Sequence, residues 1–340
     1  MRSNLVRSKG GVVLIPEICL QIAGEAINSD PKSAGSLLRL SKDFNSLLSN
    51  YERSISKSIR DSNTDEFAYT NADQATILPS RMPPGDIVVS ILSYPWIDEM
   101  HSRRQTIDFL INHEITEMMD VTNSSGWPTL DIPKDELSKR LTIFKKRALL
   151  HLYRLADCTA GLIETSAIRA QQSEFLESLS SDDLASLGVI VEVMGHGFFT
   201  MTKTALHASG LLNNTAAPLP NVSRLYTPDT TPIEDLWNDH WIRECMCVFE
   251  DLIQKYGPAF ACAYIEGSND RLRRPDLWAR SKMQNGLDNM NAYEMGYTMS
   301  YASLQSVVWR VFCKKIDCSL QDSWNVARER AEIQMEGYKV

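Results

Sequence analysis

The sequence predicts an all-α protein, and three observations lead to this prediction. Helix start and stop signals recur along the 340 residues. Apolar residues return at three- and four-residue steps, whereas the period-two alternation of strands and its Asn-Gly or Asp-Gly turns is nearly absent. No internal period of roughly 20–50 residues marks a repeat architecture. We therefore expect non-repetitive helices throughout.

The first element, residues 12–51, is predicted to form three short helices. Pro16 suits a first helical position, and Glu17 favours the positive end of the helix dipole. Asp30 and Pro31 restart a helix as cap and first residue. About forty residues in three helices cannot bury a sufficient core of their own. Apolar surface should therefore remain for a partner or for the rest of the chain.

Longer helices are predicted in the remainder of the chain, each from an apolar stripe bounded by Pro, Gly or capping residues. The clearest carries Thr231, Pro232 and Glu234 as a capping box and stops at Gly257. The 133–162 helix is expected to exceed about thirty residues, because its stripe continues that far. The full set of expected helices covers residues 95–119, 133–162, 181–207, 231–257, 293–315 and a last segment after Ser319 that carries Leu320, Trp324, Ala327 and Ala331.

Polar or proline-rich connections are predicted at residues 54–86, 211–231 and 267–290. They divide the chain into a segment at 12–51, a polar linker at 52–86 and a helical domain at 87–340, which we interpret as the recruiting domain.

Composition and charge exclude several classes of protein. A net charge of −8 argues against general binding to nucleic acid. The most apolar run, from Leu187 to Phe199, is interrupted by Glu192 and His196, which argues against a membrane span. The seven cysteines are scattered and odd in number, as expected for reduced thiols. Without a recognisable secretory signal we expect a cytoplasmic or nuclear protein, with a mitochondrial presequence as the alternative.

No common catalytic motif is present, since nucleophile elbows, phosphate loops and dinucleotide fingerprints are all missing. His113 with Glu117, and Glu192 with His196, are four residues apart on predicted helices, so each pair could offer two metal ligands. Such pairs are common by chance, and Cys245 and Cys247 lie on opposite helix faces. We therefore predict a non-catalytic protein with no cofactor and no metal; an enzyme whose site the sequence hides is the weaker alternative.

The N-terminal segment resembles an F-box, in the version common in fungal proteins. The resemblance rests on Leu14-Ile15-Pro16-Glu17-Ile18, on Asp30-Pro31-Lys32, and on Leu40-Ser41-Lys42-Asp43-Phe44 followed by Leu47 and Leu48. Ile15 stands where the family has its first proline. The resemblance implies that this segment binds a Skp-type adaptor of a cullin-RING ubiquitin ligase while the rest of the chain recruits a protein substrate of unknown identity. The implied adaptor-facing positions are Pro16, Glu17, Ile18, Ile22, Leu40, Lys42, Phe44 and Leu47.

The residues also allow another interpretation, a helical scaffold or self-associating protein whose F-box-like segment packs internally. Charge favours the adaptor, because residues 1–60 hold nine basic and five acidic residues, a local +4 that would steer an acidic partner.

A basic, tryptophan-containing connection at 267–290 is the second candidate site. Arg and Trp are enriched at interaction hot spots, and guanidinium groups pair well with carboxylate or phosphate. We therefore expect the connection to contact an acidic or phosphorylated substrate through Arg271, Arg273, Arg274 and Trp278.

Overall fold

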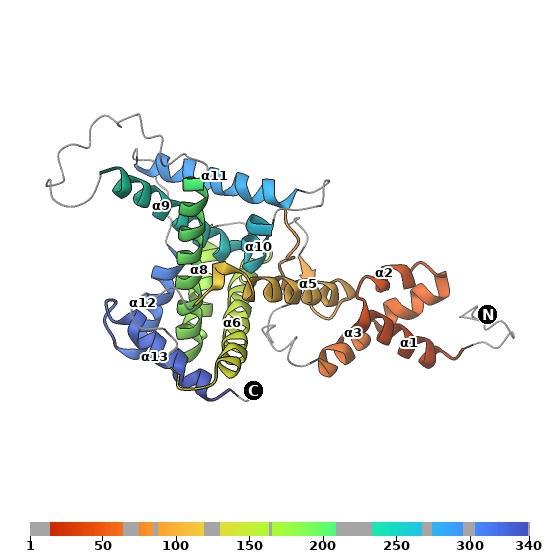
Figure 1. Ribbon diagram of the computed structural model, residues 1–340. Helices are drawn as coiled ribbons and strands as arrows, with labels where there is room; N and C mark the ends of the chain where they lie inside the picture. The colour runs from red at the N-terminus through yellow and green to blue at the C-terminus, as the bar shows by residue number, and fades with distance from the viewer. Residues whose placement is uncertain are drawn as a thin grey trace.

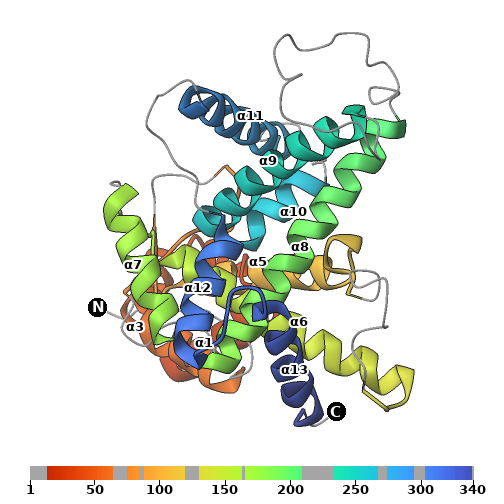
Figure 2. The ribbon, with the colours of Figure 1, turned by 90° about the vertical axis from the view of Figure 1, so that its left-hand side faces the viewer.

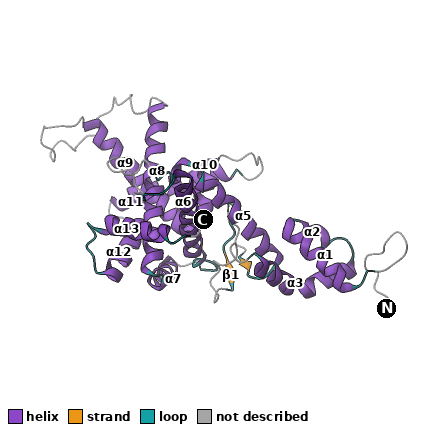
Figure 3. Cartoon of the chain, turned by 60° about the horizontal axis from the view of Figure 1, so that its bottom comes forward, coloured by secondary structure: helices purple, strands orange, loops and turns teal. Residues whose placement is uncertain are grey.

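The all-α prediction is confirmed. The computed structural model describes residues 14–63, 75–83, 88–118, 130–162, 165–208, 233–266, 274–294 and 303–338. Within these ranges the strands are two short ones, β1 (Thr76–Ile77) and β2 (Val89–Ser90), which pair antiparallel with Thr76 opposite Ser90. Helices make up the rest of the regular structure (Figure 3).

The helices form a small N-terminal lobe and a larger body, with α5 running from one to the other (Figure 1). The lobe holds α1 (Pro16–Ser29), α2 (Ser33–Leu37) and α3 (Lys42–Ser62). The connecting helix α5 (Tyr94–Ile111) is followed by a 3₁₀ turn, η1 (Glu114–Thr116). The helices of the body are α6 (Lys134–Asp157), α7 (Thr165–Ser178), α8 (Ser181–Ala208), α9 (Ile233–Tyr256), α10 (Pro258–Glu266), α11 (Pro275–Glu294), α12 (Leu304–Ile316) and α13 (Ser323–Glu336).

The central element of the body is α8, which packs against α6, α9, α12, α13 and η1 (Figure 2). Leu184, Leu187, Ile190 and Val193 of α8 are almost fully buried, as expected for a helix surrounded by others. By length and composition α8 could also cross a membrane, but 67% of its most apolar window is buried inside the body. Its apolar character is therefore explained by the core.

Two glycines let neighbouring chain segments approach α8 closely. A Cβ atom at Gly188 would lie 2.3 Å from the Trp309 ring of α12. A Cβ atom at Gly197 would lie 2.6 Å from the carbonyl oxygen of Ile115 in η1, and backbone yields less readily than a side chain.

We expect Gly197→Ala to lower the free energy of unfolding by about 1–3 kcal/mol, because η1 must move to admit the methyl group. Gly35→Ala is the matched control. Nothing lies within 4 Å of a Cβ atom there, and alanine favours helix by about 0.5–1 kcal/mol. Urea unfolding of both variants measures the difference, and equal stabilities would show that the contact with η1 has no energetic importance.

A second hydrophobic core lies between the lobe and the start of α5. Ala23 and Ile27 of α1 and Phe44 and Leu48 of α3 pack in one cluster with Trp96 of α5. Farther along α5 the side chains of Ile107 and Leu110 belong instead to the core of the body. Helix α5 therefore contributes side chains to both cores.

Polar contacts also fasten the lobe to the first turn of α5. The Tyr94 hydroxyl donates to the Leu48 carbonyl oxygen at 2.9 Å, and the Tyr94 backbone N–H donates to the Glu52 carboxylate at 2.7 Å. Ser93 caps α5, since its Oγ accepts from the Trp96 N–H.

Several predicted helix ends were wrong. The third N-terminal helix does not stop at Tyr51 but continues to Ser62, because Ile55 and Ile59 keep the apolar spacing and are buried. The predicted linker therefore begins with helix and also contains buried Ile77 and Met82. The helix expected over 95–119 ends at Ile111.

The predicted 133–162 helix was also too long. It ends at Asp157, and the chain turns through Gly161, whose φ of +77° interrupts a right-handed helix. The next helix, α7, was not predicted. By contrast, α8 matches the expected 181–207 helix, and α9 ends at Tyr256 before Gly257, as predicted. The predicted Thr231–Pro232 capping signal lies outside the described residues.

The predicted connection at 267–290 was wrong for most of its length, because α11 occupies 275–294. The helix expected over 293–315 corresponds to α12 from Leu304 onward, and residues 295–302 lie outside the described part of the chain. The last helix, α13, begins at Ser323 and buries Ala327 and Ala331, while Leu320 precedes it and is exposed.

Candidate partner-binding site

The lobe presents exposed isoleucines at the N-terminal end of α1. Ile15, Ile18 and Ile22 have exposed fractions of 58%, 38% and 56%. Ile18 and Ile22 are four residues apart and therefore lie on one face of α1, directly after Ile15 at its N-cap. Cys19, Ala23 and Ile27 lie on another face and are buried in the lobe core. Helix α1 is therefore apolar on two faces, one turned inward and one turned to solvent.

A fourth exposed apolar side chain, Leu40, lies in the turn between α2 and α3, with an exposed fraction of 62%. This turn is held by hydrogen bonds on both sides. The Ser41 hydroxyl accepts from the Phe44 N–H at 3.1 Å and so caps α3, and the Asn45 side chain donates to the Leu38 carbonyl oxygen at 2.8 Å. We call Ile15, Ile18, Ile22 and Leu40 the apolar lobe surface.

The positions implied by the F-box resemblance divide into surface and core. Pro16, Glu17, Ile18, Ile22, Leu40 and Lys42 are exposed, and Leu47 is half-buried. Phe44 is different, because only 4% of it is exposed and it packs in the lobe core. We therefore assign Phe44 to the core rather than to a partner-facing surface. Whether the exposed positions contact an adaptor stays a prediction.

The second predicted site is partly helical in the structure rather than a loop. Arg271 and Arg273 lie outside the described residues. Arg274 pairs with Asp276 at 3.1 Å, directly before α11. Trp278 is part of α11 rather than of a loop.

The ring of Trp278 packs edge-on against Tyr256, with 5.1 Å between ring centroids, and against Phe260 at 6.1 Å. Lys282 lies over the same ring at 5.8 Å. Trp278 therefore serves first as a packing residue between helices, and it is only partly available to a substrate.

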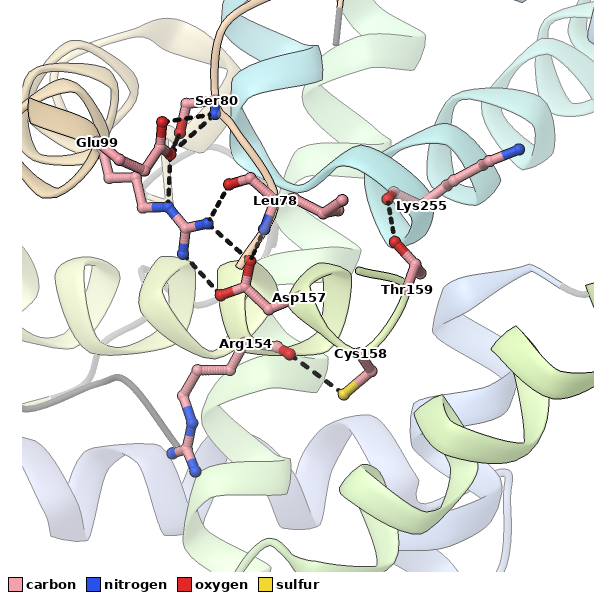
Figure 4. Close-up of polar contacts among 9 residues, drawn as sticks. Leu78, Ser80, Glu99, Arg154, Asp157, Cys158, Thr159 and Lys255 are labelled. Carbon is pink, nitrogen blue, oxygen red and sulfur yellow. Dashed lines mark hydrogen bonds and ion pairs between the residues drawn. The ribbon is translucent and has the colours of Figure 1, made fainter. Parts of the chain in front are cut away.

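Sequence reasoning missed a buried charge cluster around Arg103 (Figure 4). Arg103 of α5 contacts both Asp157 oxygens, at 2.7 and 2.8 Å, and its Nε contacts Glu99 at 2.8 Å. The guanidinium also donates to the Leu78 carbonyl oxygen, and Ser80 donates to Glu99 through its N–H at 2.8 Å. The cluster thereby joins α5, α6 and the segment after β1.

The cluster is nearly sealed from solvent, since Arg103, Glu99 and Asp157 have exposed fractions of 5%, 7% and 2%. Burial alone lowers the pKa of Arg103, but Asp157 and Glu99 outweigh this effect and hold it above its ordinary value. Burial raises the pKa of Glu99 against the opposing effect of Arg103. The Tyr153 ring covers the guanidinium at 4.5 Å. Because each charge faces a protein partner, we assign the cluster a structural role.

A second buried acid, Glu250 of α9, holds the start of α12. One of its oxygens accepts from the Ser303 hydroxyl at 2.5 Å and from the Gln305 N–H at 3.1 Å. Its other oxygen has no hydrogen-bond partner among the described residues and lies beside a small apolar cavity lined by Val191, Met194 and Phe249. Burial raises the pKa of Glu250 to about 7, although both hydrogen bonds oppose this, and Glu192 raises it further.

This raised pKa predicts a dependence of stability on pH. Between an unfolded pKa of 4.5 and a folded pKa of about 7, the unfolded chain loses the Glu250 proton while the folded chain keeps it. The contribution of Glu250 to the free energy of unfolding should be complete below pH 4.5 and fall by about 3 kcal/mol as pH rises through 7. We expect Glu250→Gln to remove this decline.

The measurement is urea unfolding of wild type and variant at pH 5, 6, 7 and 8. Glu177→Gln is the control, because the Glu177 side chain is 60% exposed. Parallel stability curves for wild type and Glu250→Gln would contradict the assignment.

The two His–Glu pairs that were considered as possible metal ligands are placed differently in the structure. His113 and Glu117 are not on a helix, because α5 ends at Ile111, and His113 Nδ1 accepts from the Ile115 N–H. Glu192 accepts instead from the side chains of Gln305 and Trp309. In the described ranges no group of three or more His, Cys, Asp or Glu side chains is placed to hold a metal ion.

Comparison of the chain with protein-family models, with curated protein sequences and with solved structures yields no match.

Proposed function

We propose that the N-terminal lobe binds a Skp-type adaptor of a cullin-RING ubiquitin ligase and that the body recruits a protein substrate without catalysing a reaction itself. The observation that carries the proposal is the apolar lobe surface. Burying an isoleucine or leucine side chain contributes about 1.5–3 kcal/mol relative to leaving it in water. Four such side chains are exposed on the lobe, and they are suited to contact with an apolar partner surface.

The F-box resemblance supports the choice of partner. It places the adaptor against Ile18, Ile22 and Leu40, which are exposed, and against Pro16 and Lys42 beside them. The surplus of four positive charges in residues 1–60 would favour encounter with an acidic adaptor. Association should therefore slow as salt concentration rises.

The test is direct binding of the purified full chain to a purified Skp-type adaptor, by size-exclusion chromatography with light scattering and by calorimetry. We expect a complex with one copy of each protein. No complex at micromolar concentration would reject the proposal. A chain that forms dimers by itself, and loses them when Ile22 is changed to Asp, would favour the self-associating scaffold instead.

A further inference from the structure

The C-terminal end of α12 has a Schellman geometry, in which a residue in left-handed conformation ends the helix. Asp317 occupies this position with φ of +57°, and the N–H of Cys318 donates to the carbonyl oxygen of Cys313 at 3.2 Å. In the Schellman motif the N–H of the residue after the left-handed position donates to the carbonyl oxygen of the residue five positions earlier, and Cys318 and Cys313 have this spacing. The motif commonly brings the side chains of those two residues into contact.

In this chain both contacting side chains are thiols. Their sulfur atoms are 3.4 Å apart, with Cys318 donating to Cys313. Cys313 is buried, with an exposed fraction of 7%, and packs in the core of the body, whereas Cys318 is half-exposed. The Cys318 thiol is therefore accessible to an oxidant in solvent, and the buried Cys313 thiol is in contact with it.

We propose that Cys313 and Cys318 are a redox modification site that forms a reversible intramolecular disulfide with a peroxide as oxidant. In the first step the Cys318 thiolate attacks one peroxide oxygen. The S–O bond forms, the O–O bond breaks, and water leaves after protonation. In the second step the Cys313 thiolate attacks the sulfur of the Cys318 sulfenic acid, the S–S bond forms, the S–O bond breaks, and the hydroxide leaves as a second water after protonation. Two thiols and one hydrogen peroxide give one disulfide and two waters, and two electrons pass to the peroxide.

The order of the two steps follows from the surroundings of the thiols. Burial raises the pKa of Cys313 to about 11, and contact with Cys318 adds to this effect. Cys313 is therefore a poor first nucleophile and suits the resolving step. Ring closure should become faster as pH rises from 7 to 9, because the thiolate fraction of Cys313 increases.

The disulfide would close the cap of α12 covalently. The backbone of Asp317 adopts the left-handed conformation that glycine favours. The hydrogen bonds of the cap are therefore opposed by some backbone strain. The same short segment leads to α13, which packs on α8. We expect oxidation to raise the melting temperature of the chain by a few degrees and reduction to reverse the change.

The experiment treats the reduced full-length protein with hydrogen peroxide, blocks the remaining thiols with an alkylating agent and maps the peptides by mass spectrometry. We expect a Cys313–Cys318 link with loss of about 2 Da, removed by dithiothreitol. Cys318→Ser should abolish the link. Cys262→Ser is the matched control and should keep it, because Cys262 donates instead to the Glu266 carboxylate.

Three results would overturn the proposal. One is that Cys318 accumulates as sulfinic acid while Cys313 remains open to alkylation. Another is that peroxide links Cys318 to a second chain, and the third is that all thiols react at the same rate. The wild-type peptide map alone decides among these outcomes, so the test does not depend on the variants folding.

Discussion

Replacing Arg103 with Met is expected to lower the free energy of unfolding by about 3–5 kcal/mol. The substitution keeps an unbranched side chain but removes the positive charge that faces Glu99 and Asp157. Two carboxylates would then remain buried without their cation, and breaking a buried ion pair in this way carries a cost of that size. Urea unfolding followed by circular dichroism measures the loss.

The neighbouring residue supplies a matched control. Arg104 carries the same side chain on the same helix and contacts Asp108 at 3.7 Å, but its side chain is 50% exposed. Exposed pairs contribute about 0–1 kcal/mol, so Arg104→Met should change stability little. Adding Glu99→Gln and Asp157→Asn to Arg103→Met should recover part of the loss, because the stranded charges disappear. Similar losses in both single Arg variants would show that the buried cluster does not stabilise the fold.

Changing Ile18 and Ile22 together to Asp is expected to weaken adaptor binding at least about 100-fold. Under the proposed function, two charges would enter an interface that excludes water, and hot-spot positions of this kind contribute about 2 kcal/mol or more each. The fold should survive, since both side chains already face solvent. Calorimetry against the purified adaptor measures the change.

The control for this variant is Ile333→Asp on α13, an isoleucine that is 68% exposed and belongs to the body. It adds charge to an exposed isoleucine outside the lobe and should leave adaptor affinity unchanged. Circular dichroism of all variants checks the fold. Adaptor binding that persists in the Ile18/Ile22 variant, or global unfolding of that variant, would show that the two isoleucines do not form the adaptor interface.

The sequence predicted helices well where an apolar stripe and a stop signal coincide, as at Gly257 after α9. It failed where tertiary contacts decide the end of a helix. Polar residues around Ile55 and Ile59 suggested a linker, yet these isoleucines join a core to which both α1 and α5 contribute.

The burial of single side chains could not be predicted for a related reason, namely that burial depends on the whole fold. The periodicity of α1 marks Ile18 and Cys19 as equally apolar, and only packing shows that Cys19 is buried and Ile18 is not. Glu99 and Arg103 could have been recognised as an i,i+4 pair. Their partner Asp157 lies 54 residues from Arg103, and no local pattern connects them.

The sharing of α5 between two cores has a mechanical consequence for a recruiting protein. Its 18 residues span about 27 Å, with Trp96 anchored in the lobe and Leu110 in the body. Such a helix acts as a rigid spacer rather than as a tether. If the lobe docks on a ligase, a substrate bound to the body is held at one fixed distance and orientation relative to that ligase. Lysines on one side of the bound cargo would then receive ubiquitin in preference to chemically identical lysines elsewhere.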